Sequence, residues 1–179
     1  MLRFDRATQR GAWPRVKALY REAFPREERA PLWLLRLLAK RGASELLAAF
    51  DGETFVGLAI VAQHERLRYV FYLAVEADLR GQGYGSAMLE ALKARYPDAR
   101  MCLCMEDPDV PCDNLPQRLR RAAFYARCGY EPTGVRLTEA GVGYALLSRG
   151  GRVSYDEYYA LMEHYMGRVI SRALYRQVQ

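Results

Sequence analysis

The feature that most constrains this chain is a strand, a glycine-rich turn and a helix that follow one another between Tyr69 and Pro97. The run YVFYLAV is apolar and rich in β-branched and aromatic residues, which is typical of a buried strand. The turn RGQGYG follows at Arg80–Gly85, and the next apolar residues have helical spacing, at Met88, Leu89 and Leu92. Glycines let a backbone approach a ligand closely, and a helix N-terminus favours negative charge. The order predicts a phosphate-binding turn, although glycines alone are also typical of an ordinary tight turn.

Two widespread phosphate-binding motifs do not fit this turn. The G-x-G-x-x-G fingerprint of dinucleotide-binding folds needs a third glycine or alanine in register, and Met88 stands at that position. A P-loop needs the sequence G-K-[ST], which the turn does not contain. The spacing R-x-x-G-x-G, directly between a strand and an amphipathic helix, is the more specific signal.

A second motif lies downstream of the turn. The sequence RAAFYARCGY at Arg121–Tyr130 has the form R-x-x-F-Y-x-x-x-G-[FY]. Together with Leu73-Ala74-Val75 and Arg80–Gly85, it resembles the signature of the GNAT superfamily of N-acyltransferases. The resemblance covers most of the chain and is weakest at its two ends.

The resemblance implies that acetyl-CoA is the cosubstrate. A thioester oxygen would accept from the backbone N–H of Ala74 or Val75, and pantetheine would pair with a strand edge left free where two parallel strands splay apart. The turn would hold the pyrophosphate. The cofactor-binding residues are therefore expected to be Leu73, Ala74, Val75, Arg80, Gly81, Gln82, Gly83, Tyr84, Gly85 and Ser86.

The resemblance also suggests a general acid. The second aromatic residue of the F-Y pair, Tyr125, would point at the CoA sulfur. A phenol with an ordinary pKa of about 10 is protonated at neutral pH and can donate to a departing thiolate. The alternative is a structural tyrosine packed beside Phe124.

The general base is where the sequence departs from the family. Many members carry a glutamate in the strand before the turn, but the positions here are occupied by aromatic residues, Tyr69, Phe71 and Tyr72. Cys104 stands where a second acid is frequent. Glu106 remains, at the C-terminal end of a strand, where open α/β sheets place their sites. It would take the proton directly or through water, or it is a surface residue; the weaker candidates are His64, Glu65, Asp107 and Asp109.

The helix that carries Tyr125 also departs from the family pattern. Arg118 and Arg121 stand where an asparagine often contacts pantetheine. In the GNAT family, the loop after the first helix often borders the acceptor site. That loop is Pro25–Ala30, where Glu27 and Glu28 would attract a cationic amine, or where the charges belong to a solvated connector.

The remaining periodicities predict a mixed α/β fold. It is a GNAT-like central, mostly antiparallel sheet with one splayed parallel strand pair, flanked by helices. Strands are expected at Leu2–Thr8, Glu45–Phe50, Thr54–Gln63, from Tyr69, and at Arg100–Glu106, Thr133–Leu137 and Gly143–Ser148. Helices are expected at Trp13–Phe24, Pro31–Arg41, after the glycine turn, at Leu115–Cys128 and from Ser154.

The domain prediction is a GNAT acyltransferase domain over residues 1–150 with a helical extension over 151–179 packed on it. Ser154 and Glu157 form a capping-box pattern at the start of the extension. A helical stripe follows, either core or a homodimer contact, formed by Tyr155, Tyr158, Met162, Tyr165 and Val169; a solvated face is formed by Arg168, Arg172 and Arg176. The helix at Leu115–Cys128 is predicted to pack through Leu119, Ala122, Ala123 and Ala126.

Composition and charge argue against several other classes of protein. The formal net charge is +6, but the basic residues are spread along the chain, which favours a polyanionic cofactor over nucleic acid. No apolar run is long enough for a membrane span and the start lacks a signal-peptide core, so a cytoplasmic protein is expected. Cys102, Cys104, Cys112 and Cys128 fit no zinc pattern and are expected to be reduced, buried or half-buried thiols. No metal is expected.

Together these observations predict transfer of an acetyl group from acetyl-CoA to a primary amine by direct attack in a ternary complex. The first alternative is a non-catalytic acyl-CoA-binding module, because the strand glutamate is missing. The second is a basic nucleic-acid binder, for which no groove-reading motif is present. The amine acceptor is not identified by the sequence: a polyamine, an aminoglycoside, an amino acid, a peptide N-terminus and a protein lysine all remain open.

Overall fold

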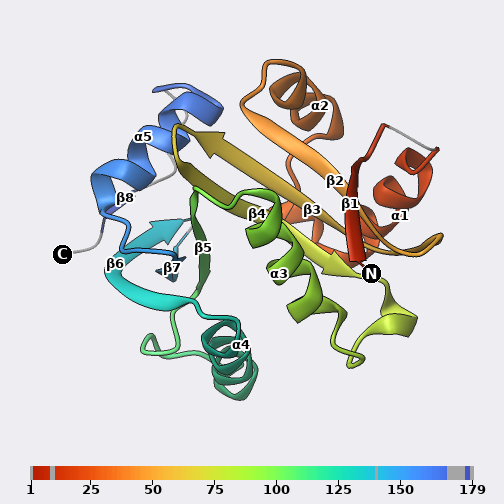
Figure 1. Cartoon of the computed structure of the whole chain (residues 1–179). Helices are drawn as coiled ribbons and strands as arrows, with labels where there is room; N and C mark the ends of the chain where they lie inside the picture. The colour runs from red at the N-terminus through yellow and green to blue at the C-terminus, as the bar shows by residue number, and fades with distance from the viewer. Residues whose placement is uncertain (1, 9–10, 140, 169–175, 178–179) are drawn as a thin grey trace. The chain divides into compact units, whose positions relative to one another are not determined.

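The computed structural model describes residues 2–8, 11–139, 141–168 and 176–177, without the side chains of Glu27, Glu139, Arg176 and Gln177. The chain forms two compact units, and each is described by itself. Unit 1 comprises residues 1–63 and 70–97, and unit 2 comprises residues 64–69 and 98–179. The elements of both are labelled in Figure 1.

Unit 1 is an antiparallel sheet with helices on both faces. Its elements are β1 (Leu2–Arg6), α1 (Trp13–Ala23), the short turn η1 (Arg26–Glu28), α2 (Leu32–Lys40), β2 (Ser44–Asp51), β3 (Thr54–His64), β4 (Leu67–Val75), η2 (Ala77–Leu79) and α3 (Tyr84–Arg95). The last residue of β3 and the first three of β4 belong to unit 2. The strands follow the order β1-β2-β3-β4, with β1 and β3 antiparallel to β2.

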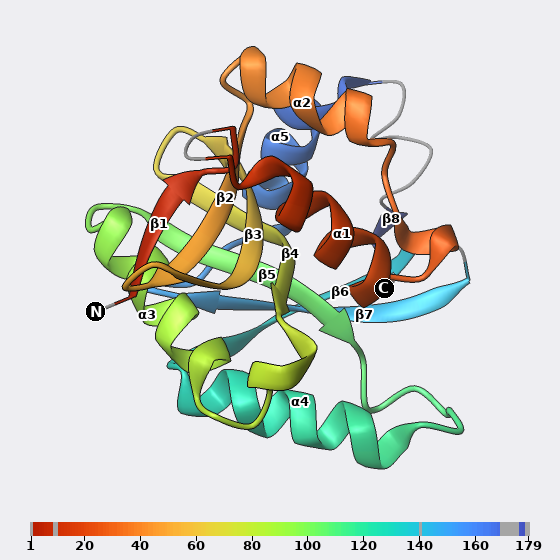
Figure 2. The same ribbon diagram turned by 90° about the vertical axis from the view of Figure 1, so that its right-hand side faces the viewer.

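Alternation along the strands explains why both faces of unit 1 are covered. Ala48 and Phe50 of β2 pack in the cluster with α1, whereas Ala49 between them packs in the cluster with Met88 of α3. Successive side chains of a strand point to opposite faces, so a nearly continuous apolar strand needs a helix on each side. Figure 2 shows α1 lying over one face of these strands.

Unit 2 begins with the parallel pair of the sheet. Its elements are the start of β4, β5 (Arg100–Glu106), α4 (Leu115–Arg127), β6 (Glu131–Glu139), β7 (Val142–Arg149), α5 (Tyr155–Met166) and β8 (Arg176–Gln177). Leu67–Tyr69 pair in parallel with Arg100–Cys102. The order continues β5-β7-β6-β8 through antiparallel pairs, in which Met101 opposes Arg149 and Glu106 opposes Tyr144.

The predicted fold class is confirmed. The sheet is mixed and mostly antiparallel, β4 and β5 are its parallel pair, and helices flank it. The predicted elements are all present within a few residues of their expected bounds. The predicted splay of the parallel pair stays a prediction, as does the division at residue 150.

The face that α4 buries is not the predicted one. Leu119 is 52% exposed, and Ala123 and Ala126 are exposed as well, while Ala122 alone of the predicted set is half-buried. The buried residue of the helix is instead Arg118, which is 7% exposed. Hydropathy patterns assign arginine to the surface, but a guanidinium can be buried when all its N–H groups find acceptors. Those acceptors are described with the candidate site.

The helix predicted from Ser154 is confirmed by its capping box. The Ser154 hydroxyl accepts from the Glu157 N–H, and the Glu157 carboxylate accepts from the Ser154 N–H at 3.0 Å. Tyr158, Met162 and Tyr165 are buried as the stripe predicted, and the ring of Tyr158 meets that of Tyr69 edge-on at 5.5 Å. Val169, Arg172 and the side chain of Arg176 lie outside the described residues, so the predicted arginine face and the dimer contact stay predictions.

The four cysteines lie where the composition predicted: Cys102 and Cys128 are buried, and Cys104 and Cys112 are half-buried. Among the described residues, no helix is both long and apolar enough to cross a membrane.

The ion pair between Arg100 and Glu157 predicts how stability changes with pH. Hydrogen bonds from the Arg100 guanidinium and from the backbone of Ser154 lower the pKa of Glu157 from 4.5 to about 2. A carboxylate with a depressed pKa stabilises the fold above its unfolded-state pKa, and this contribution is lost as the pH falls from 4.5 towards about 2. Because the Glu157 side chain is 40% exposed, solvent screening limits the contribution to about 0.5–1 kcal/mol.

We therefore expect Glu157→Gln, which keeps the capping-box shape, to lower the free energy of unfolding at neutral pH and to match wild type near pH 2. Urea denaturation across this pH range measures the difference. Asp156→Asn removes the same charge from the same exposed first turn of α5 without an ion pair, so it is the matched control. A loss at Glu157 no larger than at Asp156 would contradict the prediction.

Candidate functional site

The end of β4 is held at close range by β3. A Cβ atom at Gly57 of β3 would lie 2.3 Å from the carbonyl oxygen of Ala74 and 2.9 Å from the sulfur of Met88, so only glycine fits there. Ala74 faces the cluster with α1, while Leu73 and Val75 pack in the cluster with α3. The three cofactor-binding residues expected at the end of β4 are thus packed from both faces of unit 1.

The turn after β4 is shaped by its glycines. Gly81 and Gly83 have φ of +77° and +86°, in the left-handed region, and a Cβ at either position would meet nothing within 4 Å. Side chains brace the turn on its inner side: Arg80 Nε donates to the Val75 carbonyl at 3.2 Å, and Gln82 Nε2 donates to the Asp78 carbonyl at 3.0 Å. The backbone at the two glycines is left open to a ligand.

The N-terminus of α3 fits an anion. The helix starts at Tyr84, earlier than the sequence predicted, so Tyr84 and Gly85 lie in its first turn and Gly83 is the N-cap. No side chain caps this end and its first turn contains no acidic residue. The first N–H groups of a helix have no acceptor within the helix, and the helix dipole adds positive potential there. These residues therefore fit the pyrophosphate of CoA.

Glu106 lies in unit 2 at the end of β5, and two arginines of α4 engage it. Arg118 Nη2 lies 3.1 Å from one carboxylate oxygen, and Arg121 Nη1 lies 3.5 Å from the other. Arg118 also donates to the Asp107 carbonyl at 2.8 Å and to the Asn114 side chain at 2.9 Å. Every nitrogen of this buried guanidinium has an acceptor, which is why α4 can turn an arginine inward.

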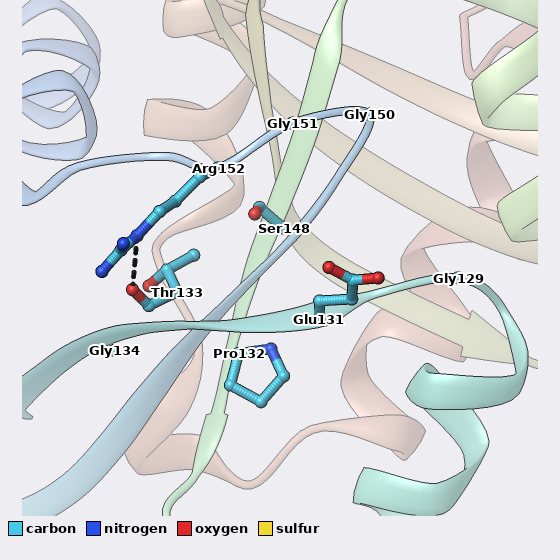
Figure 3. A pocket seen from close by; sticks show the side chains of 9 residues that line it. All are labelled: Gly129, Glu131, Pro132, Thr133, Gly134, Ser148, Gly150, Gly151 and Arg152. Carbon is cyan, nitrogen blue, oxygen red and sulfur yellow. Dashed lines mark hydrogen bonds between the residues drawn. The ribbon is translucent and has the colours of Figure 1, made fainter.

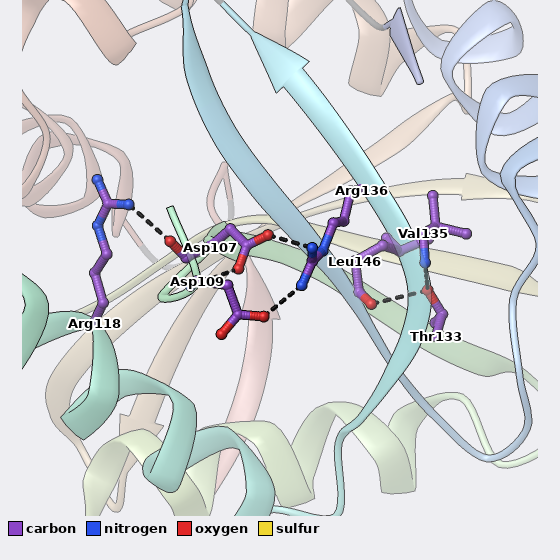
Figure 4. Close-up of polar contacts among 7 residues, drawn as sticks. All are labelled: Asp107, Asp109, Arg118, Thr133, Val135, Arg136 and Leu146. Atoms are coloured by element: carbon purple, nitrogen blue, oxygen red, sulfur yellow. Dashed lines mark hydrogen bonds and ion pairs between the residues drawn. The ribbon is translucent and has the colours of Figure 1, made fainter. Parts of the chain in front are cut away.

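A second pair of acids follows Glu106. Asp107 is 3% exposed; one of its oxygens accepts from the Asp109 N–H at 2.9 Å, and the other lies 3.1 Å from Nε of Arg136 on β6. Arg136 also pairs with the Asp109 carboxylate. Figure 4 shows this chain of charges linking α4, the loop after β5 and β6. Asp107 and Asp109 are thus committed to the loop, which weakens them further as candidate bases.

Tyr125 lies one helical turn after Arg121 on α4. It is half-buried between Phe124 and Tyr130, whose ring centroids lie 5.1 and 6.0 Å from its own. Burial raises the pKa of Tyr125, so its phenol keeps its proton at neutral pH. Among the residues that the structure describes, its hydroxyl has no hydrogen-bond partner, which suits a group that donates to a substrate.

Comparison with protein families decides the assignment. A sequence model of the acetyltransferase (GNAT) domain matches residues 42–132, more than half of the chain. The chain belongs to the GNAT acetyltransferase family. The match contains the glycine turn, β5 and the F-Y motif, so the sequence resemblance is confirmed. A search of curated proteins found no matching sequence.

Solved structures support the fold of this GNAT protein. A GNAT-family protein from Bacteroides thetaiotaomicron has 23% identity and a TM-score of 0.73, and the match covers 94% of this chain and 98% of that one. The aminoglycoside 6'-N-acetyltransferase from Enterococcus faecium has 16% identity and a TM-score of 0.62, covering 86% and 99%. A Bacillus subtilis acetyltransferase in complex with CoA has 15% identity and a TM-score of 0.55, covering 83% and 98%.

The expected acceptor loop of the GNAT domain is tied to its sheet. Glu28 ends η1; its side chain is exposed, and its carbonyl accepts a 2.6 Å hydrogen bond from the Tyr72 hydroxyl. The backbone of Glu27 lies in η1, and its side chain is outside the described residues. In the sequence Tyr72 stands out only as one of the aromatic residues at the place of the missing base, and this contact was not predicted. A signal was present, since a buried tyrosine hydroxyl usually finds a hydrogen-bond partner.

The GNAT domain also has a cavity that sequence reasoning did not predict. It lies in unit 2, has a volume of about 560 Å³ and is lined by Gly129, Glu131, Pro132, Thr133, Gly134, Ser148, Gly150, Gly151 and Arg152 (Figure 3). It lies at the end of β7 that pairs with Met101, the opposite end of β5 from Glu106. It is therefore separate from the candidate base. Among the described residues no cluster of acids, histidines and cysteines is suited to a metal ion.

The buried guanidinium of Arg118 gives a stability prediction. Arg118→Met keeps much of the side-chain volume but leaves Glu106, Asn114 and the Asp107 carbonyl without this donor. Removing one partner of a buried pair leaves the other partner buried without its hydrogen bonds, so we expect a loss of about 2–3 kcal/mol in the free energy of unfolding. Denaturation by guanidinium chloride measures this change in the free energy of unfolding. Arg120→Met, at an exposed position of the same helix, should change stability by less than about 0.5 kcal/mol; equal effects would show that the network contributes nothing.

Proposed function

We propose that this protein transfers an acetyl group from acetyl-CoA to a primary amine by direct attack in a ternary complex. The observation that carries the proposal is the open, glycine-shaped turn at residues 80–86, which leads from β4 into an uncapped helix N-terminus. Membership in the GNAT acetyltransferase family supports it. Acetyl-CoA supplies the acetyl group as a thioester.

The residues divide the chemistry between them. The backbone N–H of Ala74 or Val75 donates to the thioester oxygen, where negative charge develops in the transition state. The turn from Arg80 to Ser86 holds the pyrophosphate. Tyr125 donates its proton to the sulfur as the C–S bond breaks. Burial raises the pKa of Tyr125, so the phenol carries the proton to be donated at neutral pH.

Glu106 is proposed to accept the proton that the amine loses, through a water molecule. Both carboxylate oxygens are already engaged by arginines, so direct contact with the amine is the less favoured route. Each carboxylate oxygen keeps a second lone pair for water. Glu27 and Glu28, on the loop after α1, are proposed to attract a cationic acceptor. The protein is proposed to act in the cytoplasm and to need no metal.

The alternative is a non-catalytic acyl-CoA-binding module. Two observations favour it: β4 carries tyrosines where many relatives have a glutamate, and Glu106 is paired with two arginines. Both functions require acetyl-CoA binding, and only the enzyme requires turnover. The first experiment below tests the binding that both functions require, and the second, which measures turnover, separates them.

The glycine turn predicts how acetyl-CoA binding responds to mutation. Gly83→Glu forces a side chain into the left-handed region and places a negative charge at the helix N-terminus, so we expect a loss of affinity of at least about tenfold. Isothermal titration measures the dissociation constant. Gly52→Glu is the matched control, because Gly52 also has positive φ and open space, in the hairpin between β2 and β3. No binding by wild type would falsify both functions.

The proposed acid predicts a kinetic effect. Tyr125→Phe should lower kcat by about 100-fold in an acetylation assay over polyamine, aminoglycoside, amino-acid and peptide acceptors, while acetyl-CoA affinity stays unchanged. Tyr159→Phe, on α5, is the control that loses the same atom. In wild type, the raised pKa of Tyr125 predicts no alkaline loss of kcat from this group below about pH 10.

Two outcomes would contradict the enzyme. If no acceptor in the panel is acetylated although acetyl-CoA binds, the binding module is supported. If turnover occurs but Tyr125→Phe retains wild-type kcat, the enzyme stands and the acid must be another group.

A further inference from the structure

The hydroxyl of Tyr72 holds the loop between α1 and α2 through two backbone hydrogen bonds. It donates to the Glu28 carbonyl at 2.6 Å and accepts from the Ala30 N–H at 3.1 Å. A single oxygen on β4 therefore satisfies a donor and an acceptor that are two residues apart in the loop. All these groups belong to unit 1.

A second tyrosine holds the same loop from α1. The Tyr20 hydroxyl donates to the Ala30 carbonyl at 3.0 Å, so both backbone groups of Ala30 are bound by tyrosine oxygens. The rings support one another: Tyr72 meets Tyr20 edge-on at 5.0 Å and Phe24 edge-on at 4.8 Å. Tyr20 is 1% and Tyr72 5% exposed. Such packing leaves the two hydroxyls few other orientations.

Tyr72 is also part of the strand proposed to present the thioester. It directly precedes Leu73, Ala74 and Val75, and the backbone of Ala74 is fixed by its close contact with Gly57. Only Leu73 separates Tyr72 from Ala74, so the contacts that hold the loop and those that hold the end of β4 come from neighbouring residues of one strand. The side chain of Glu28 is exposed at the point where its own carbonyl is held.

We propose that Tyr72 is a positioning residue for the acceptor, because its hydroxyl fixes the backbone that presents the Glu28 carboxylate to a cationic amine. The inference rests on the proposed function. It narrows the amine acceptors of the proposed acetyl transfer to those with more than one positive charge. A second charge can pair with Glu28 while the reacting amine is neutral. Tyr72 lies on the strand where many relatives carry a glutamate, and here it positions the substrate rather than transferring a proton.

The experiment uses the full chain and compares wild type with Tyr72→Phe, Glu28→Gln and the double variant. Spermidine is the polycationic probe and ethanolamine the singly charged one. Tyr72→Phe removes one oxygen, so the Glu28 carbonyl and the Ala30 N–H lose this hydrogen-bond partner. We expect the KM for spermidine to rise about fivefold or more, with a smaller change for ethanolamine and an unchanged dissociation constant for acetyl-CoA.

The double variant distinguishes positioning from loss of stability. If Tyr72 acts through Glu28, the double variant should have the KM of the worse single variant, because the two changes remove one interaction. Tyr96→Phe is the matched control: it removes a hydroxyl hydrogen-bonded to Glu45 elsewhere in unit 1 and should leave the KM for spermidine unchanged. Amide exchange at Ala30, followed by NMR, should accelerate in Tyr72→Phe and in the double variant, and should stay unchanged in Glu28→Gln and Tyr96→Phe.

Each remaining outcome has a fixed meaning. An unchanged KM for spermidine in Tyr72→Phe, or effects of the two single variants that multiply in the double variant, would overturn the inference and leave the proposed function standing. Binding of acetyl-CoA without acetylation of any amine would overturn the proposed function and this inference with it. Acetylation of ethanolamine as efficiently as spermidine by wild type would overturn the narrowing to polycationic acceptors alone.

Discussion

The close approach of β3 to β4 at Gly57 is the constraint on which the organisation of unit 1 depends. Because the carbonyl of Ala74 occupies the space of a side chain at Gly57, β4 cannot move away from β3 without opening a gap. That contact fixes the strand in both directions. Towards its C-terminus it sets where the glycine turn and the N-terminus of α3 begin, and two residues earlier it sets Tyr72, which holds the loop after α1.

In unit 2 the end of β5 is held instead by ion pairs and hydrogen bonds around two buried charged residues, Arg118 and Asp107. Arg118 and Arg136 bring Glu106, Asp107 and Asp109 together where β5 ends, and they do so from α4 and β6, the two elements that follow β5 in the chain. A buried guanidinium is tolerated only when its donors are all used, so this network specifies one arrangement of helix, loop and strand. The candidate base is part of that network, which ties any catalytic role of Glu106 to the packing of α4.

Sequence reasoning predicted the fold and the family well because both are carried by local patterns. The turn at Arg80–Gly85 and the F-Y motif with Tyr125 each consist of residues that follow one another in the chain. The spacing of apolar residues in the strands and helices is also regular. The failure at α4 has a physical cause: a rule that buries alanine and leucine cannot anticipate that Arg118 finds acceptors at Glu106 and Asp107, outside its helix, as well as at the N-cap residue Asn114. The contact of Tyr72 was missed for the same reason, since its partners lie more than forty residues away.

The sequence alone determined the order of strands and helices, the glycine conformations of the turn and membership in the GNAT family, since each depends on residues adjacent in the chain. Tertiary structure alone decided which polar groups are joined: Glu106 to Arg118 and Arg121, and the loop after α1 to Tyr72. Hydrogen bonds and ion pairs form between groups that folding brings within about 3 Å, and periodicity carries no information on such distances. The stretch before the glycine turn lacks the carboxylate of its relatives, and the structure gives its tyrosine a hold on the loop after α1 instead.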